Sequence, residues 1–261
     1  MSAIAASILN ANYSNLREEI ETVDNAGADM FTLDVMDGRF VPTITFGDYV
    51  VARVREWTAL PIETHLMVED PLNWIDLMAD AGADVITFHV EATEAPEAVI
   101  ERIRARDRSV GIAIDLTTSV EAAIPLLPLV DLVNLLAVPA GFGGQTFHPE
   151  THSRIARVRE AARQEGTEIA IEVDGGIKVE NAREVATAGG DILVVGTGIY
   201  RSLDRQSAVR RFKEEVGVAD AVTARLLGRS DLSRSRSPEV VKRLIERRDA
   251  LGIPPTSWPI D

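Results

Sequence analysis

The sequence repeats one short pattern at three places where an apolar segment of helical spacing ends and another apolar run begins. The three copies read Ala26-Gly27-Ala28-Asp29, Ala81-Gly82-Ala83-Asp84 and Ala188-Gly189-Gly190-Asp191. Glycine commonly ends a helix because it adopts the left-handed backbone conformation without strain. The residues after each copy are apolar and suit a buried strand. The pattern is therefore typical of strands and helices that alternate along the chain.

The same criteria, applied to the whole chain, predict eight strand–helix pairs. The predicted strands are residues 3–9, 30–34, 61–67, 85–90, 110–114, 130–138, 168–173 and 192–195. The predicted helices are residues 15–26, 46–57, 70–80, 94–106, 118–127, 149–164, 178–188 and 204–215. Eight alternating pairs in 261 residues predict an α/β fold, a closed (β/α)8 TIM barrel, because such barrels use ~250 residues. An open eight-stranded sheet is the alternative, but it would carry a Gly-rich turn after its first strand, where none occurs.

The alternation stops after Glu215. We therefore divide the chain into a barrel at residues 1–216 and a C-terminal helical extension at residues 217–261. The extension contains an Arg/Ser run at residues 233–237, for which a solvated loop is a better interpretation than a site for an acidic partner. We expect the extension to pack on the barrel or on a neighbouring subunit.

Composition excludes several kinds of function. The formal net charge is −14, so we expect no nucleic-acid partner. The chain has no cysteine, which rules out disulfides, thiolate nucleophiles and zinc–thiolate sites. No apolar run is long enough to span a bilayer, and the first ten residues lack the pattern of a signal peptide. We therefore expect a cytoplasmic protein with no membrane partner.

In such a barrel the site lies at the carboxyl ends of the strands. Asp34 and Asp174 stand at the ends of the second and seventh predicted strands, on opposite sides of the ring. Two facing carboxylates can remove a proton from one side of a carbon and supply one from the other, as inversion next to a carbonyl requires. A single aspartate at a strand end is often only a turn or cap residue, but the pair together with His65 favours catalysis.

The same three residues could bind a metal ion. Asp34, His65 and Asp174 offer nitrogen and oxygen donors without sulfur, a set suited to Zn²⁺, Mn²⁺, Fe²⁺ or Co²⁺. A divalent ion could polarise a carbonyl and stabilise an enediolate. His89 is a weaker candidate, for which a supporting or structural hydrogen bond is the better interpretation. Met36 shares the face of Asp34 and could form an apolar wall.

Three glycine-containing turns follow the last three predicted strands. They comprise residues 141–145, Gly175-Gly176 and Gly196-Thr197-Gly198. Glycine lets backbone N–H groups approach an anion closely, and barrels often hold phosphate at the turns after strands seven and eight. One such turn would be weak support, but three adjacent ones predict a phosphate site.

Four segments together closely resemble the ribulose-phosphate 3-epimerase family. They are residues 33–42 (LDVMDGRFVP), 65–68 (HLMV), 141–145 (GFGGQ) and 172–177 (EVDGGI), and the likeness runs in order over residues 3–215. The resemblance implies epimerisation at carbon 3 of D-ribulose 5-phosphate, with Asp34 and Asp174 as the acid/base pair and Asp34, His65 and Asp174 on the metal. It implies a phosphorylated sugar as partner and a homo-oligomer. It also implies substrate contacts from Ser7, Met36, His65, Met67, Gly141, Gly143, Gly144, Gly175, Gly176, Gly196 and Thr197.

The chain departs from the family pattern around the metal and the substrate. Thr32 stands where the family usually has a metal-binding histidine, and Leu136 replaces a methionine expected near the metal. Ala6, Asp115-Leu116 and Pro139-Ala140 also differ from the usual residues. These changes leave two alternatives open: an epimerase for a tetrulose or hexulose phosphate, or a sugar-phosphate-binding barrel without catalysis. A barrel decarboxylase is disfavoured because the sequence has no strand-end Asp-x-Lys-x-x-Asp run.

Overall fold

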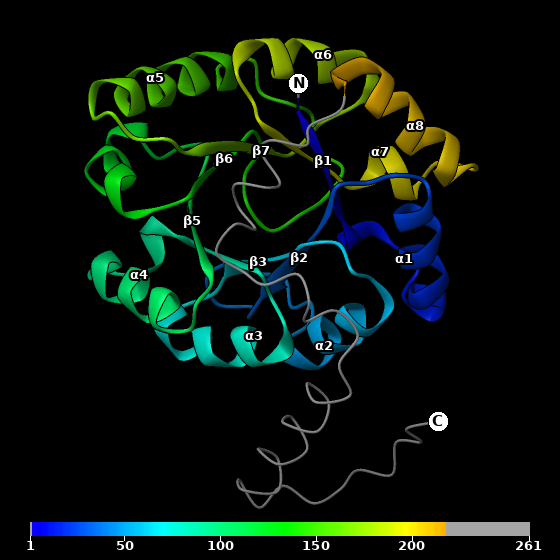
Figure 1. Cartoon of the computed structure of the whole chain (residues 1–261), viewed down its shortest axis with the longest axis horizontal. Coiled ribbons are helices and arrows are strands. Elements are labelled where there is room, and N and C mark those ends of the chain that lie inside the picture. The colour runs from blue at the N-terminus through cyan, green and yellow to red at the C-terminus, as the bar shows by residue number, and fades with distance from the viewer. Residues whose placement is uncertain (1, 218–261) are drawn as a thin grey trace, which may run out of the picture.

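Short runs of buried residues form eight parallel strands in the computed structural model, which describes residues 2–217. The strands pair in sequence order and β1 closes on β8, which confirms the predicted (β/α)8 barrel (Figure 1). The strands are β1 (Ala3–Ser7), β2 (Met30–Met36), β3 (Ile62–Met67), β4 (Val85–His89), β5 (Ser109–Ile114), β6 (Leu132–Leu136), β7 (Ala170–Asp174) and β8 (Ile192–Val195).

Helices connect the strands on the outside of the barrel (Figure 1). The α-helices are α1 (Leu16–Asn25), α2 (Asp48–Trp57), α3 (Ile75–Ala81), α4 (Pro96–Ala105), α5 (Thr151–Gln164), α6 (Val179–Ala188), α7 (Thr197–Tyr200) and α8 (Arg205–Val216). Short 3-10 turns are η1 (Ile8–Asn10), η2 (Tyr13–Asn15), η3 (Pro71–Asn73), η4 (Val90–Ala92), η5 (Val120–Ala122) and η6 (Ile124–Leu129). No helix within residues 2–217 is long and apolar enough to cross a membrane.

Each strand presents alternate residues to the two sides of the barrel wall. On β2, Phe31, Leu33 and Val35 belong to the large core between strands and helices, whereas Thr32 and Asp34 lie on the other face. A small apolar cluster made of side chains such as Ala3, Met30 and Ile192 fills the amino-terminal end of the barrel interior. The interior is therefore apolar at one end and polar toward the carboxyl ends of the strands.

The glycine of the repeated sequence pattern ends a helix, as predicted. Gly82 and Gly189 follow α3 and α6 with φ of 100° and 111°, in the left-handed region. The aspartate of the pattern has a role that the sequence did not indicate. It lies directly before a strand and accepts a hydrogen bond from the backbone N–H of the preceding strand, for example from Ile62 to Asp84 at 2.9 Å.

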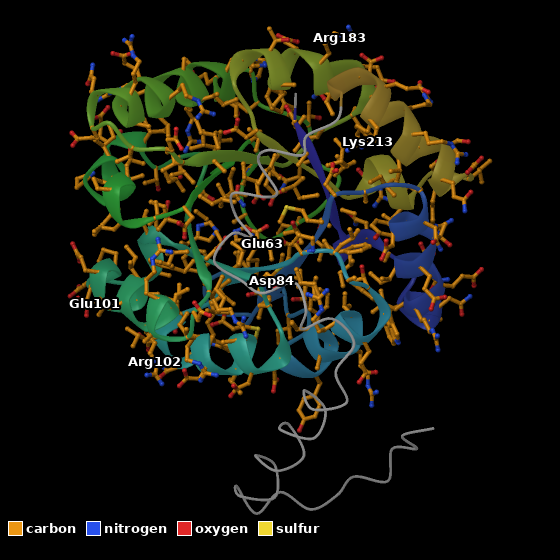
Figure 2. All side chains as sticks on the ribbon, viewed as in Figure 1. Glu63, Asp84, Glu101, Arg102, Arg183 and Lys213 are labelled. Atoms are coloured by element: carbon orange, nitrogen blue, oxygen red, sulfur yellow. The ribbon has the colours of Figure 1, made fainter. Side chains whose placement is uncertain are left out.

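Four aspartates repeat this arrangement, once before each even-numbered strand, and we call them the strand-start aspartates. Each also pairs with a cation from a helix: Asp29 with Lys213 (2.6 Å), Asp84 with Arg55 (2.7 Å), Asp131 with Arg104 (2.5 Å) and Asp191 with Arg159 (2.5 Å). Their backbone donors are Ile4, Ile62, Val110 and Ile171. Asp84 and Lys213, from two of these pairs, lie in different parts of the ring (Figure 2). The aspartates thus tie strands to helices around the barrel.

The structure differs from the sequence prediction in several places. The helix predicted at residues 118–127 is replaced by the 3-10 turns η5 and η6, because Pro125 and Pro128 cannot donate backbone hydrogen bonds. The first strand ends at Ser7, earlier than predicted, and the short helix α7 was not predicted. The predicted extension at residues 217–261 lies outside the described residues except for Gly217, and it remains a prediction.

Candidate active site

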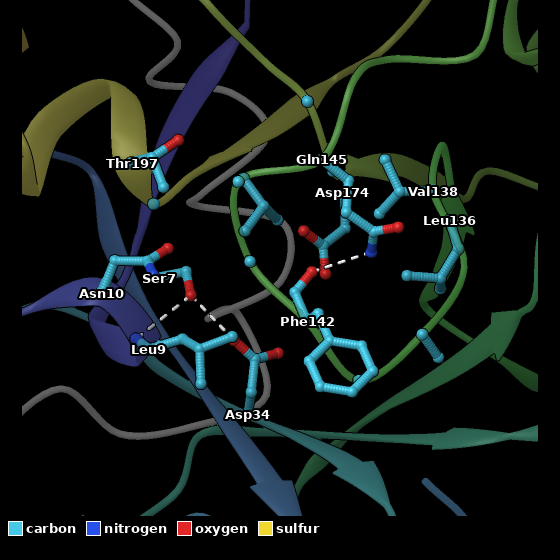
Figure 3. Close-up of a pocket in the computed structure, with 18 of the residues that line it drawn as sticks. Ser7, Leu9, Asn10, Asp34, Leu136, Val138, Phe142, Gln145, Asp174 and Thr197 are labelled. Atoms are coloured by element: carbon cyan, nitrogen blue, oxygen red, sulfur yellow. Dashed lines mark hydrogen bonds between the residues drawn. The ribbon is translucent and has the colours of Figure 1, made fainter. Parts of the chain in front are cut away.

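The predicted catalytic carboxylates come together at the carboxyl ends of β2 and β7. Asp34, His65 and Asp174 each place a potential ligand atom within 4.8 Å of the other two. His65 Nδ1 lies 3.0 Å from Asp34 Oδ1 and 3.6 Å from Asp174 Oδ2. Ser7 Oγ donates a hydrogen bond to the second oxygen of Asp34 at 2.8 Å (Figure 3). Both carboxylates point toward one cavity (Figure 3).

The two aspartates have different electrostatic surroundings. Burial and the charge of Asp34 raise the pKa of Asp174 from 3.8 to about 7. Burial alone would lower the pKa of His65, but its hydrogen bond to Asp34 and the charges of both aspartates raise it. Asp34, in contrast, accepts a hydrogen bond from Ser7, and its other oxygen lies 3.0 Å from His65 Nδ1. Asp174 is therefore suited to hold a proton near neutral pH, while Asp34 is arranged as a hydrogen-bond acceptor.

The second aspartate of the 33–42 segment has a structural role. Asp37 accepts backbone hydrogen bonds from Arg39 at 2.8 Å and Phe40 at 3.0 Å, which close the turn after β2. Its other oxygen accepts from the backbone N–H of Glu69 at 2.8 Å, which ties the turns after β2 and β3 together. Asp37 therefore shapes the rim of the site.

A buried polar layer lies inside the barrel beneath the site. Thr32, two residues before Asp34, donates to Glu63 Oε2 at 3.0 Å, and Thr87 donates to Glu63 Oε1 at 2.5 Å. Glu63 lies at the centre of the barrel (Figure 2). Glu172 is also fully buried, and burial together with the charge of Glu63 raises the pKa of Glu172 well above its usual range. Burial therefore favours the protonated form of Glu172, and the hydroxyl of Thr32 is bonded within this layer.

Neither glutamate was singled out from the sequence. A signal was present, because Glu63 and Glu172 stand two residues before His65 and Asp174 and so face the same side of their strands. A carboxylate on the inner face of a barrel strand is rare enough to mark the interior as polar.

The predicted substrate contacts line the cavity, with one exception. Ser7, Asp34, Met36, Met67, Asp174, Gly141, Gly143, Gly144, Gly175, Gly176, Gly196 and Thr197 all line it. His65 does not, because its side chain is fully buried behind Asp34 and Asp174. Met36 and Met67 pack with Val41 as an apolar wall. Asn10 also lines the cavity and was missed, and Phe142 and Gln145 line it from the predicted 141–145 turn (Figure 3).

The glycines crowd one end of the cavity so closely that larger residues would not fit. A Cβ atom on Gly176 would lie 2.2 Å from the backbone nitrogen of Phe147, and one on Gly143 would lie 2.5 Å from Asn10 Oδ1. Gly175 and Gly176 also have positive φ, 109° and 69°. The backbone is thus exposed to a ligand at this end, which suits an anion.

Two cations that the sequence did not indicate approach the same end. Lys178 Nζ donates to Thr197 Oγ1 at 2.5 Å. A Cβ atom on Gly144 would lie 3.5 Å from Arg201 Nη1. Neither side chain forms an ion pair with any carboxylate in the described part of the chain. Their positive charge is therefore available to an anion at the glycine-lined end.

The Asp34–His65–Asp174 group could hold a divalent cation. Its donors are one imidazole nitrogen and carboxylate oxygens, and a cation would offset the repulsion between the two carboxylates that raises the pKa of Asp174. Thr32 directs its hydroxyl proton to Glu63 in the layer beneath this group. The donor set fits a metal with three protein ligands.

Comparison with known proteins places this chain in a family. The profile of the ribulose-phosphate 3 epimerase family matches residues 3–200. The chain belongs to the ribulose-phosphate 3 epimerase family. It is 38% identical to the ribulose-phosphate 3-epimerase of Synechocystis sp. over 79% of this chain and 90% of that protein. The Bacillus subtilis ribulose-phosphate 3-epimerase is also 38% identical, over 82% of this chain and 99% of that protein. The family consists of isomerases, as the site predicted.

More distant solved structures share the fold of this epimerase family member. KGPDC from Streptococcus mutans superposes with a TM-score of 0.66 at 15% identity, over 84% of this chain and 99% of that chain. Orotidine 5'-phosphate decarboxylase from Pyrococcus horikoshii OT3 superposes with a TM-score of 0.61 at 16% identity, over 82% of this chain and 100% of that chain. These similarities support the barrel architecture alone.

Proposed function

We propose that this family member interconverts D-ribulose 5-phosphate and D-xylulose 5-phosphate by inverting carbon 3. The observation that carries the proposal is the pair Asp34 and Asp174, two carboxylates in one cavity, with the pKa of Asp174 raised to about 7, in a chain of this family. Carbon 3 lies next to the carbonyl of the substrate, so its proton can be removed to give an enediolate. One aspartate takes that proton and the other returns a proton to the opposite face.

The hydrogen-bond partners support an assignment of the two roles. Asp34, which accepts a hydrogen bond from Ser7, is the base in one direction, and Asp174, on the other side of the cavity, is the acid. The roles exchange in the reverse direction. Met36 and Met67 exclude water from the side of the cavity where the planar enediolate would lie.

The glycine-lined end supports recognition of a phosphate group. Backbone around Gly144, Gly176 and Gly196 borders the cavity, with Thr197 beside it. Lys178 and Arg201 add positive charge at that end of a chain whose formal net charge is −14. We therefore assign the substrate phosphate to this end and the reacting carbons to the aspartates.

We assign a divalent metal, Zn²⁺, Mn²⁺, Fe²⁺ or Co²⁺, to Asp34, His65 and Asp174. When bound, the ion supplies positive charge that stabilises the negative charge developing on the substrate oxygens. The protein residues hold the ion and orient the carbon between the two carboxylates.

A second candidate function is epimerisation of another ketose phosphate, such as a tetrulose or hexulose phosphate. The observation that favours it is the altered surroundings of the site, where Thr32 is bonded to Glu63 and Leu136 lines the cavity. The cytoplasmic location and the homo-oligomeric state remain predictions from the sequence.

Proton exchange decides between these functions. The protein is incubated in heavy water with D-ribulose 5-phosphate, and deuterium at carbon 3 is followed by NMR alongside product formation. We expect exchange and D-xylulose 5-phosphate, and Asp174→Asn should slow turnover by about 10²–10⁴-fold. If the wild-type protein exchanges no proton on this sugar but does so on a tetrulose or hexulose phosphate, the second candidate replaces the first. Unchanged turnover in Asp174→Asn would contradict the mechanism.

A further inference from the structure

A chain of hydrogen bonds leads from His65 away from the cavity. His65 Nε2 lies 3.0 Å from His89 Nε2, and His89 Nδ1 lies 3.2 Å from Glu91 Oε2. Both imidazoles are fully buried. The other oxygen of Glu91 accepts the backbone N–H of Asp115 at 2.8 Å. The chain therefore links the carboxyl ends of β3 and β4 to the residue after β5, and it does not touch the cavity.

The donors and acceptors in this chain can run in only one direction. The Glu91 carboxylate is an acceptor, so His89 must donate to it from Nδ1. Two facing ring nitrogens cannot both carry protons at 3.0 Å, and a neutral imidazole has one N–H, so His89 Nε2 accepts. His65 must then donate from Nε2.

With the proton of His65 on Nε2, the other ring nitrogen, Nδ1, does not have to carry a proton. Nδ1 is the nitrogen that faces the two aspartates. His65 Nδ1 lies 3.0 Å from Asp34 and 3.6 Å from Asp174, so it is the only ring nitrogen that can join both as a ligand. Without the chain, a neutral His65 could instead carry its proton on Nδ1 and donate it to Asp34. That form cannot bind a metal at Nδ1.

We propose that His89 and Glu91 are positioning residues that hold the proton of His65 on Nε2 and so keep Nδ1 available to a cation shared with Asp34 and Asp174. This inference rests on the metal site of the proposed function. The hydrogen bonds through His89 and Glu91 fix the orientation of one metal ligand, His65. A fixed ligand matters more in a site with three protein ligands than in one with four. Groups that orient a metal-binding histidine typically change metal affinity 10–100-fold when removed.

The test uses full-length protein with ¹⁵N-labelled histidine. The sequence has four histidines, of which His148 and His152 are more exposed, so the signals of the two buried rings can be assigned by substitution. Long-range ¹H–¹⁵N spectra are recorded with and without Zn²⁺. In the Zn²⁺-bound protein we expect protons on His65 Nε2 and His89 Nδ1, and an unprotonated, metal-shifted His65 Nδ1.

Three variants separate positioning from simple packing, with the Zn²⁺ dissociation constant measured by chelator competition. His89→Phe keeps an aromatic ring but removes the acceptor, and we expect about 10–100-fold weaker Zn²⁺ binding. His89→Gln offers an amide oxygen to His65 Nε2 and should restore most of the affinity. His148→Gln, at a partly exposed histidine outside the chain, is the matched control and should bind Zn²⁺ as the wild-type protein does.

A proton on His65 Nδ1 in the Zn²⁺-bound protein would overturn the inference. So would unchanged Zn²⁺ affinity in a His89→Phe variant that is folded by circular dichroism, or a wild-type protein that binds no Zn²⁺. Failure of the proposed function gives a different result. In that case Zn²⁺ binds with the expected pattern of protons, but no ketose phosphate is turned over.

Discussion

Asp34 and Asp174 are the same residue type in one cavity, yet their partners give them different chemistry. Asp34 accepts a hydrogen bond from Ser7 and lies beside His65 Nδ1, whereas Asp174 is surrounded by buried groups and negative charge. Both positions were predicted because they end apolar strands. The raised pKa of Asp174 was not predictable, since it depends on burial and on the charges of Asp34 and Glu63.

The pH dependence of stability should report the raised pKa of Asp174. In metal-free protein this pKa is about 7, against 3.8 ordinarily, so the folded state binds the proton more tightly than the unfolded state. The resulting stabilisation is complete below pH 3.8 and is lost as pH rises through about 7. We expect the unfolding free energy of chelator-treated wild-type protein to fall between pH 5 and pH 8, measured by urea denaturation.

Asp174→Asn removes this titrating group. The unfolding free energy of the variant should therefore fall less steeply between pH 5 and pH 8. A remaining slope is expected, because the pKa of His65 is also raised and its stabilising effect has the same sign. Identical slopes in the two proteins would contradict the assignment of the raised pKa to Asp174.

Lys178 and Arg201 should contribute to substrate binding and not to the chemical step. Lys178→Met and Arg201→Met each remove one charge-assisted contact, which is worth about 1.5–3 kcal/mol, or roughly 10–100-fold in affinity. We expect KM for the ketose phosphate, and the inhibition constant of inorganic phosphate, to rise by about that factor with kcat little changed. Arg210→Met, on the exposed face of α8, is the control. A fall in kcat at constant KM would show that these residues act in the chemical step and not in substrate binding.

At the scale of elements, regular periodicity made most helices and strands predictable. The prediction failed where a tertiary contact or a proline decided the local conformation. Residues 118–127 have helical composition, but two prolines convert them to 3-10 turns. Lys178 lies just before α6 and bonds to Thr197, and Arg201 lies just after α7 and approaches Gly144. No spacing in the sequence reveals that both side chains reach the glycine-lined end of the cavity.

The turn after β7 should tolerate no side chain at its second glycine. A Cβ atom at Gly176 would lie 2.2 Å from Phe147 N, a backbone atom that cannot move alone, so Gly176→Ala must displace the turn. Gly166, after α5, has a similar φ of 64° but nothing within 4 Å. We expect Gly166→Ala to cost about 1 kcal/mol from its backbone conformation alone.

Gly176→Ala should lower the melting temperature further than Gly166→Ala and abolish competition by inorganic phosphate. Calorimetry gives the first quantity and inhibition of turnover gives the second. Equal melting temperatures, with phosphate inhibition retained, would show that the turn accommodates a methyl group.

At the scale of the whole molecule, the strand-start aspartates join the barrel into a ring. Lys213→Met leaves Asp29 partly buried without its cation, and we expect a loss of about 1–3 kcal/mol. For a protein of this size each kcal/mol lowers the melting temperature by about 2–4 °C. Arg211→Met, an exposed position on the same helix, should change it little. Equal melting temperatures for the two variants would show that the Asp29–Lys213 ion pair does not stabilise the protein.

The four strand-start aspartates also imply an order of assembly during synthesis. Three of them find their cations 27 to 32 residues away, so those pairs can form while the chain is still being translated. Asp29 can pair only after Lys213 has been synthesised, 184 residues later. A nascent chain that stops before α8 therefore keeps an unmatched carboxylate beside β1, and the seam between the first and last strands is the final part of the ring to close. Ribosome-stalled intermediates should be open at that seam and nowhere else in the described barrel.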